Sequence, residues 1–507
     1  MADRDLHRHR DAGGASLLPQ NAGLIEGCAV FTRQVLPLIV LLLAACAVGP
    51  DFKGPSAPNT SRYVPEEPEV LAGPAPTESA TAMFVNGGLV SNHWWESFRC
   101  EALSALVEQA LVHSPTVLEA RARLREAQED LTAQSRGTLY PGIDAQLGVT
   151  RQKLDPAAFG IPNLPATPPF TLYNAQVNVY YTFDLFGANR RAVEGLRARR
   201  DYQNYESQAA ALTLAANVVA AAIRQADLQA QVDLTEQLLQ AQMRQLEIAE
   251  DRYRVGGISQ EALQSQGAQV EQLRAVLAPL KAQRQQVDHE LVVYLGGTPA
   301  ETRIPAIRLA DLHQPRSIPV TLPADLVRRR PDVQAYEALW HEAAANVGVA
   351  TADLLPSVTL SGYAGSDRTN ASGILDSFNV WSVGAKLMQP IFHAGELRAR
   401  KRATVAAYDA AAQAYEQTVL ESLQQVADGL RALAADSLAL EARSSALDRT
   451  SSNYDIAQRR FDVGGISEQS LLDAQRDRLQ SRLDCSQAEA QRLADTVALL
   501  HAMAGSI

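Results

Sequence analysis

The chain has 507 residues, a formal net charge of −11 and only 6% aromatic residues. Few aromatic residues beside abundant Ala and Gln favour packed helices over a large β-sandwich or an α/β core. An acidic chain without a basic stripe is a poor binder of nucleic acid, so that class of function is excluded.

Residues 1–45 are typical of a secretory signal peptide with an unusually long polar start. The apolar run Val35–Cys46 follows Arg33 and is too short to span a bilayer as a helix. It ends in Leu-Ala-Ala-Cys, which resembles the bacterial lipobox, in which the cysteine is acylated and becomes the first residue of the mature chain. We therefore expect a lipid on Cys46. Ala47 and Val48 follow with no aspartate, and the resemblance to known lipoproteins then implies sorting to the outer membrane. An ordinary signal peptide followed by a chance cysteine is the alternative.

Residues 46–97 are expected to form a lipid-anchored, extended segment. The stretches GPDFKGPSAPNTS and PEEPEVLAGPAPTESA are rich in Pro, Gly and small polar residues. Such a composition does not supply a packed core. It predicts a tether that leads away from the anchor.

The first half of the folded chain, residues 98–300, begins with one helical pattern from Phe98 to about Leu139. After the break LYPG the period changes to two, with alternate apolar residues over about 141–151 and again over about 172–184. Each stretch is polar on one side only and is long enough to cross a bilayer as a tilted strand. Soluble, half-buried strands show the same alternation, so the pattern alone leaves the environment open.

The second half, residues 323–507, repeats this order after an equatorial linker over residues 301–322. One helical pattern from about Pro323 again ends at a proline, in the sequence LLP. Alternating strands are then predicted at about 356–366 and 378–389.

Two very long helices follow the strand pairs. Residues 196–255 contain neither Gly nor Pro, and no Pro occurs after Pro390. A continuous helix over 186–255 would reach about 100 Å at 1.5 Å per residue, and the stretch 393–463 has a similar length. No compact domain needs helices of this length, so they are interpreted as coiled-coil arms.

Each long helix ends in the same glycine turn. The sequence RYRVGGIS ends at Ser259 and RRFDVGGIS ends at Ser467, and the flanking residues match at one offset (456 − 248 = 208). A fixed offset of this size indicates a duplicated structural unit. The glycines permit the left-handed backbone that ends a helix, and the two serines are placed to cap the next one. The tips of two helical hairpins are thus predicted at 255–259 and 463–467.

Four predicted strands are too few to close a membrane barrel. An open sheet in hydrocarbon leaves backbone groups unpaired, so several chains must share one barrel if these strands span a membrane. Lys386 falls on the polar side of the last strand, where it fits a water-filled lumen, whereas the lipid side would be unfavourable. Oligomerisation is therefore a physical requirement of this interpretation.

The sequence carries no motif for catalysis or cofactor binding. It has no phosphate-binding loop of the G-x-x-x-x-G-K kind and no G-x-S-x-G nucleophile turn. The histidines lack metal-ligand spacing, and His341 is interpreted as a packing or surface residue. Cys100 and Cys485 are interpreted as free thiols, although a disulfide between them is chemically permitted in the periplasm. We predict no enzymatic activity, no catalytic residue, no cofactor and no metal.

Several motifs taken together indicate a family. They are the lipobox followed by CAVGPDFKGP, then HWWESF, YTFDLFG, MQPIFHAGELRAR and the two VGGIS turns. The chain resembles the outer-membrane factor family, of the NodT/OprM type related to TolC, over essentially the whole mature sequence. The resemblance implies a mixed α and β membrane protein: a homotrimer with a 12-stranded transmembrane β-barrel, four strands per chain, continued by a long periplasmic α-helical coiled-coil barrel.

The same resemblance implies a function and a set of partners. The protein would be a passive duct in the bacterial outer membrane that docks a periplasmic adaptor and an inner-membrane pump of the RND type, and that carries small molecules. The outer-membrane duct of a type I protein secretion system and a non-conducting coiled-coil tether are the alternatives. A tether has no use for the four strands, so conductance in a planar bilayer separates it from a channel.

The resemblance also assigns roles to single residues. The adaptor-docking tips fall on Arg254, Val255, Gly256 and Gly257, and on Asp462, Val463, Gly464 and Gly465. The segment QSLLDAQR resembles the periplasmic gate, which assigns Gln469 and Asp473 to the gate, with Asp473 forming an acidic ring across three protomers. Glycines that only end helices and a solvated aspartate are the structural alternatives. Asp462 stands where the family tends to carry a basic residue, and we expect a charge pair between Asp462 and Arg254 of another hairpin.

Overall fold

The computed structural model describes residues 47–56, 60, 62–64, 83–155, 160, 165, 168–376 and 378–505. The predicted signal peptide and the predicted lipidation site Cys46 lie outside these residues. The chain divides into two units. The strand unit comprises Met1–Gly49, Pro141–Arg190 and Thr351–His393, and the helical unit comprises Pro50–Tyr140, Arg191–Ala350 and Ala394–Ile507.

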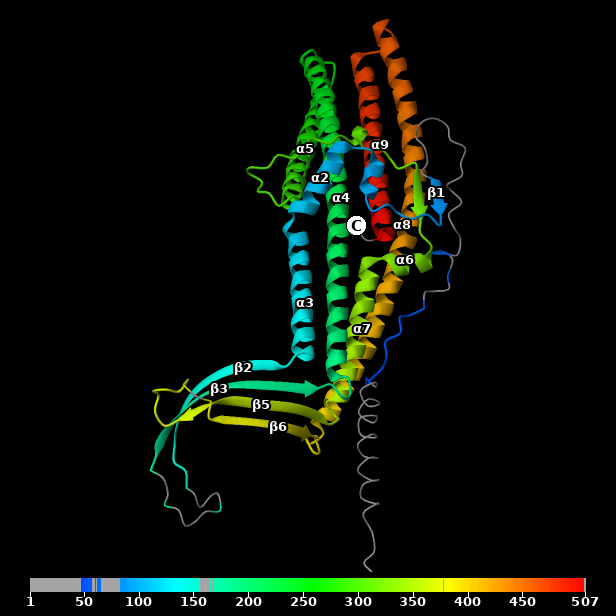
Figure 1. Cartoon of the computed structure of the whole chain (residues 1–507). Coiled ribbons are helices and arrows are strands. Elements are labelled where there is room, and N and C mark those ends of the chain that lie inside the picture. Colours follow the sequence, from blue (N-terminus) through cyan, green and yellow to red (C-terminus); the bar gives the residue numbers. More distant parts are fainter. Residues whose placement is uncertain are drawn as a thin grey trace, which may run out of the picture. The chain divides into compact units, whose positions relative to one another are not determined.

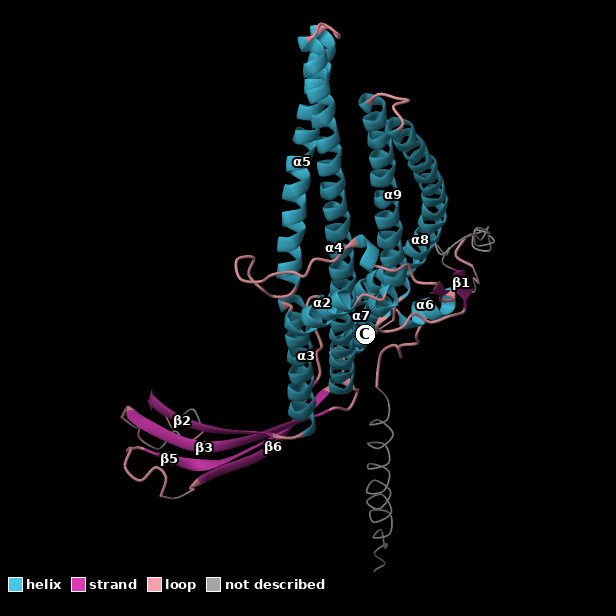
Figure 2. Cartoon of the chain, turned by 90° about the horizontal axis from the view of Figure 1, so that it is seen from above, coloured by secondary structure: helices cyan, strands magenta, loops and turns pink. Residues whose placement is uncertain are grey.

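The strand unit contains one four-stranded antiparallel sheet, drawn in magenta in Figure 2. Its strands are β2 (Gly142–Gln152), β3 (Phe170–Phe183), β5 (Ser357–Arg368) and β6 (Val380–Met388), in the order β2-β3-β5-β6. Each strand lies where the sequence alternates with period two, and β3 pairs with β5 to join the two halves of the chain. Among the described residues, β2 and β6 each pair on one side only, so the sheet has two open edges.

The register places apolar and polar residues on opposite faces of the sheet. Ala145 lies opposite Val177, Val177 opposite Ala364, and Ala364 opposite Trp381, which gives an apolar row across all four strands. On the other face the side-chain oxygen of Gln146 accepts hydrogen bonds from the Gln176 and Asn178 amides, both at 3.4 Å. Most apolar side chains of the first face are exposed, which is unusual for a sheet in water.

The helices account for most of the remaining chain. They are η1 (Trp94–Phe98), α2 (Glu101–His113), α3 (Pro115–Leu139), α4 (Ala188–Arg254), α5 (Gln260–Tyr294), η3 (Leu309–Asp311), α6 (Pro323–Arg329), α7 (Pro331–Ala352), α8 (Glu396–Asp462) and α9 (Glu468–Met503). Figure 1 shows α4 with α5, and α8 with α9, as two helical hairpins. α4 and α8 have 67 residues each, which corresponds to about 100 Å of helix.

Two prolines interrupt helices that the sequence pattern predicts as continuous. The expected helix from Phe98 to Leu139 is divided at Ser114, whose ψ of 127° lies outside the helical range, and Pro115 starts α3. The expected helix from Pro323 is divided in the same way at Arg330, because Pro331 follows it. Proline lacks an amide donor and forces the preceding residue away from helical angles, so the helix ends there. The apolar period of the sequence continues across the proline and therefore does not reveal the break.

The core of the helical unit includes residues that the sequence analysis assigns to the anchor segment. Trp94 and Trp95, in η1, are buried together with Phe98. Large aromatic side chains contribute much of the apolar area in a core, so the packed structure starts before residue 98. β1 (Met83–Asn86) also pairs in parallel with β4 (Ser317–Val320), where only extended and linker segments are expected. α4 has a stretch long and apolar enough to cross a membrane, but 61% of it is buried, as in a core helix.

Candidate functional site

The two hairpin tips have the same backbone geometry. Gly256 and Gly464 adopt φ values of 75° and 74°, in the left-handed region that favours glycine. The amide of Gly257 donates to the Arg252 carbonyl and that of Gly465 to the Arg460 carbonyl, both at 2.7 Å, which closes the ends of α4 and α8.

The second helix of each hairpin, α5 or α9, starts at a serine cap. The hydroxyls of Ser259 and Ser467 accept hydrogen bonds from the amides of Ala262 and Ser470, as the sequence predicts.

The side chains of the tips point into solvent. Val255 and Val463 are each 82% exposed, so both tips end in a bare apolar residue beside a glycine turn. Arg254 pairs with Asp251 of its own helix at 2.9 Å, and the Asp462 carboxylate accepts from Gln458 at 2.9 Å. Within one chain the expected pair between Arg254 and Asp462 is therefore not formed, because each side chain has a closer partner one turn away on its own helix.

The predicted gate residues lie where α9 faces α4. The amide of Gln245 on α4 donates to the Asp473 carboxylate at 2.9 Å, and Arg476 lies 3.5 Å from the same oxygen. The guanidinium of Arg252 on α4 donates to the Gln469 side-chain oxygen at 2.6 Å. Gln469 and Asp473 thus connect the second hairpin to the first within one protomer.

A third link between the hairpins is an ion pair that the sequence analysis does not name. Arg244 contacts both carboxylate oxygens of Glu468, at 2.8 Å from Nε and 3.3 Å from Nη2. The hydrogen bond from Arg244 holds the pKa of Glu468 below its ordinary value. The link is therefore formed above the ordinary pKa of glutamate and is lost as the pH falls through the lowered value. No local pattern marks this pair, because its members lie 224 residues apart.

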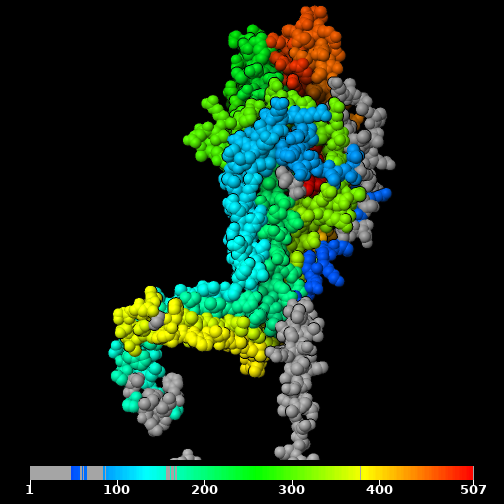
Figure 3. Space-filling view, in the orientation of Figure 1, coloured from blue at the N-terminus to red at the C-terminus, as the bar shows by residue number. Residues whose placement is uncertain are grey.

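A small apolar cluster lies between the same helices. Leu234 and Leu238 of α4 pack with Leu479 of α9, and Leu273 and Leu483 lie against them. The space-filling view in Figure 3 shows the ends of the two hairpins, green and orange, next to each other. Three polar links, and one apolar cluster further from the tips, thus hold the two hairpins together.

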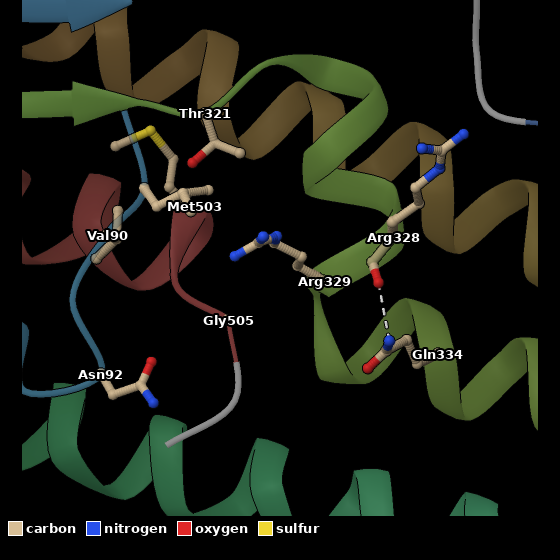
Figure 4. Close-up of a pocket in the computed structure, with 9 residues that line it drawn as sticks. Val90, Asn92, Thr321, Arg328, Arg329, Gln334, Met503 and Gly505 are labelled. Atoms are coloured by element: carbon tan, nitrogen blue, oxygen red, sulfur yellow. Dashed lines mark hydrogen bonds between the residues drawn. The ribbon is translucent and has the colours of Figure 1, made fainter. Parts of the chain in front are cut away.

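A cavity of about 170 Å³ lies elsewhere in the helical unit. Its lining residues, shown in Figure 4, are Leu89, Val90, Asn92, Thr321, Arg328, Arg329, Gln334, Met503 and Gly505. Gln334 donates a hydrogen bond of 2.8 Å to the Arg328 carbonyl. None of the predicted tip or gate residues lines this cavity.

Other chemistry-bearing side chains occupy structural positions. No group of three or more His, Cys, Asp or Glu among the described residues is arranged to hold a metal ion. Cys100 and Cys485 are separate, buried thiols. The His341 ring stacks on Phe52 and its Nε2 lies 2.9 Å from Glu194. These contacts fit the packing role that the sequence analysis gives His341.

Comparison with known proteins defines the family. The model of the outer membrane efflux protein family matches residues 106–297 and 322–505. The chain is 27% identical to the pyoverdine export outer membrane protein OpmQ of Pseudomonas putida, over 93% of this chain and 96% of that protein. It is 25% identical to nodulation protein T of Rhizobium leguminosarum bv. trifolii, over 73% of this chain and 75% of that protein.

A solved structure shares the fold. The outer-membrane channel OprN superposes with a TM-score of 0.76 and 26% sequence identity, covering 91% of this chain and 99% of that one. The chain belongs to the outer membrane efflux protein family. Within it, the protein is an outer-membrane factor of RND-type efflux systems, a channel component located in the outer membrane with a helical periplasmic extension.

Proposed function

We propose that three copies of this chain form one continuous duct from the periplasm through the outer membrane. The observation that carries the proposal is the sheet with two open edges, β2 and β6, and an exposed apolar face. Open edges are not tolerated in hydrocarbon, and four strands are too few to close on themselves. Three sheets joined edge to edge give a closed barrel of 12 strands (3 × 4).

The two faces of the sheet fit this barrel. The apolar row through Val177 and Trp381 suits contact with lipid, and the polar row through Gln146 and Gln176 suits a water-filled lumen. Lys386 lies opposite Thr359 in the register, on the polar face of the sheet. The hydroxyl groups of Thr359 and Thr182 form a hydrogen bond of 3.1 Å on the same face. A lysine on the lumen side adds a charge to the pore and avoids the unfavourable free energy of placing that charge in lipid.

The hairpins provide the periplasmic part of the duct. The bare valines and glycine turns at 255–257 and 463–465 are docking surfaces for the hairpins of a periplasmic adaptor, which connects the duct to an inner-membrane RND pump. Asp473 and Gln469 belong to the gate, and the bonds that join them to α4 must break before the second hairpin moves away from the first. A duct of this kind carries small molecules passively, and the pump selects them.

The first prediction tests the trimer. Native mass spectrometry of the detergent-solubilised protein is expected to show three chains, because only pooled strands leave no open edge. The same preparation is expected to conduct ions in a planar bilayer. A stable monomer would contradict the shared barrel, and a trimer without conductance would favour the coiled-coil tether.

The second prediction concerns the anchor. Because Cys46 ends a lipobox-like run, Cys46→Ser is expected to abolish incorporation of a labelled fatty acid and to leave unprocessed precursor. Export is expected to fall only slightly, since one lipid adds little to a protein already held by a barrel. Cys100→Ser is the matched control, because it removes a thiol from a buried core position. Equal label in wild type and Cys46→Ser would refute acylation at this residue.

A further inference from the structure

The duplication produces two equivalent turns between a strand and a long helix. Gly187 precedes α4 with φ 83°, and Gly395 precedes α8 with φ 84°. The two glycines are separated by the same offset as the hairpin tips (395 − 187 = 208). Both positions require the left-handed backbone that glycine adopts without strain. Their surroundings, however, differ.

The first turn is covered by the described start of the chain. The amide of Val48 donates a hydrogen bond of 3.0 Å to the Phe186 carbonyl. A Cβ added at Gly187 would lie 2.7 Å from both Cα and Cβ of Ala47, closer than real Cβ atoms approach other heavy atoms. The residue directly after Cys46 therefore lies on a glycine that leaves no room for a side chain.

The first turn is also ordered by its own residues. The Asp184 carboxylate accepts hydrogen bonds from the amides of Asn189 at 3.1 Å and of Arg190 at 3.0 Å, at the start of α4. It also pairs with the Arg190 guanidinium at 3.1 Å. Capping of free amides at a helix start fixes the turn against which Ala47 and Val48 lie.

In the part of the chain that the structure describes, the second turn is exposed. Phe392 occupies the position equivalent to Asp184 (184 + 208 = 392) and is 83% exposed, and Ile391 beside it is 94% exposed. A Cβ added at Gly395 would meet no atom of the described residues within 4 Å. The left-handed backbone requires a glycine at both turns, so it does not account for the contact with Ala47. That contact is specific to the first turn.

The residues that follow are held in the helical unit. Asp51 pairs at 2.6 Å with Arg191, whose side chain is only 6% exposed, and Arg191 also pairs with Glu194 at 2.8 Å. Phe52 packs edge-on against Trp340 and stacks on His341 of α7. Burial raises the pKa of Glu194, but hydrogen bonds from His341 and Arg191 outweigh it and leave the pKa below its ordinary value. Glu194 is thus charged at neutral pH, which keeps Arg191 in place for Asp51.

We propose that the turn formed by Asp184, Phe186 and Gly187 is a binding site for the mature N-terminus of the chain, the N-terminal seat. Ala47 and Val48 occupy the seat, and Asp51 and Phe52 hold the residues after it. Because Ala47 directly follows the predicted acylation site, the seat holds the point where the lipid anchor joins the described chain. A single acyl chain binds a membrane only marginally, so a fixed position makes the anchor act together with the strands. The position of the anchor rests on the proposed acylation of Cys46, whereas the seat itself does not.

The test uses the full chain with Val48→Cys as a reporter. Cys100 and Cys485 are buried. Because the sequence also has Cys28 and Cys46, labelling is read at residue 48 itself, by mass spectrometry of the labelled peptide. Adding Gly187→Ala is expected to raise the labelling rate by at least about tenfold, because the new methyl group displaces Ala47 and exposes the reporter. Adding Gly395→Ala introduces the same backbone strain and is expected to leave the rate unchanged.

Each outcome decides between the seat and a local structural role. Equal labelling in the two alanine variants would overturn the seat. Failure of Gly187→Ala to assemble, while Gly395→Ala gives normal oligomers by native mass spectrometry, would also overturn it, since the glycine would then serve folding. Labelled fatty acid measured in the same samples tests the anchor separately. Absence of that label with an intact difference in labelling rate would refute the anchor and leave the seat.

Discussion

Replacing Gly256 or Gly464 with tryptophan is expected to reduce export to the level of cells that lack the channel. Among the described residues no atom lies within 4 Å of a Cβ added at either position, so the new side chain starts in open space. It would occupy the surface beside Val255 or Val463, where we propose that the adaptor docks. The measurement is dye efflux from cells that carry the complete exporter, with oligomers checked by native mass spectrometry.

Alanine at the same positions is the matched control for the tip variants. Alanine and tryptophan share the strain of the left-handed backbone, about 1–2 kcal/mol per residue, but only tryptophan adds bulk. Gly256→Ala and Gly464→Ala are therefore expected to retain most of the export. Full export by both tryptophan variants would leave these turns with a purely structural role. Equal loss in the alanine and tryptophan variants would mean that the backbone, and not the docking surface, is critical.

The second large effect is expected at the gate. Three Asp473 carboxylates converging on one axis would attract cations, so the closed pore is expected to prefer cations and to be blocked by divalent ions or hexammine complexes. Asp473→Asn is expected to shift the selectivity towards anions and to weaken the block by at least about tenfold, because it removes three charges from one ring. Single-channel recording in a planar bilayer measures both quantities.

The control for Asp473→Asn is a variant that removes one negative charge from another part of the chain. Asp251→Asn deletes the same charge from the exposed end of α4, where Asp251 pairs with Arg254. It is expected to leave selectivity and block unchanged. If Asp473→Asn and wild type had the same selectivity and the same affinity for the blocker, the acidic ring would be wrong. Asp473 would then serve only as the acceptor for Gln245 that joins α9 to α4.

The elements of this fold follow from local sequence patterns. Period-two alternation predicts the four strands. The absence of Gly and Pro over residues 196–255 predicts one long helix there, which is observed as α4. The glycine turns and serine caps are equally local, because backbone angles and free amides at a helix end are satisfied within a few residues. The two proline breaks at Pro115 and Pro331 were also present in the sequence, but the continuous apolar period hides them.

The contacts between these elements were decided by tertiary structure. A motif assigns Asp473 and Gln469 to the proposed gate, but their partners Gln245 and Arg252 lie on the other hairpin and show no sequence signal. Periodicity tells which face of a helix is buried. It does not tell which turn of one helix faces which turn of another, because that depends on the packing of whole helices. The Arg244 to Glu468 ion pair depends on the same packing.

The two turns before the long helices separate what the sequence determines from what the tertiary structure determines, within one duplicated motif. The sequence by itself determined that glycine stands at 187 and at 395, because the repeat offset and the left-handed backbone are properties of each half. Only the tertiary structure decided that Ala47 lies against Gly187 and that, among the described residues, no atom lies within 4 Å of a Cβ at Gly395. A repeat fixes what the two halves have in common, whereas a single N-terminal segment can fold against only one of them.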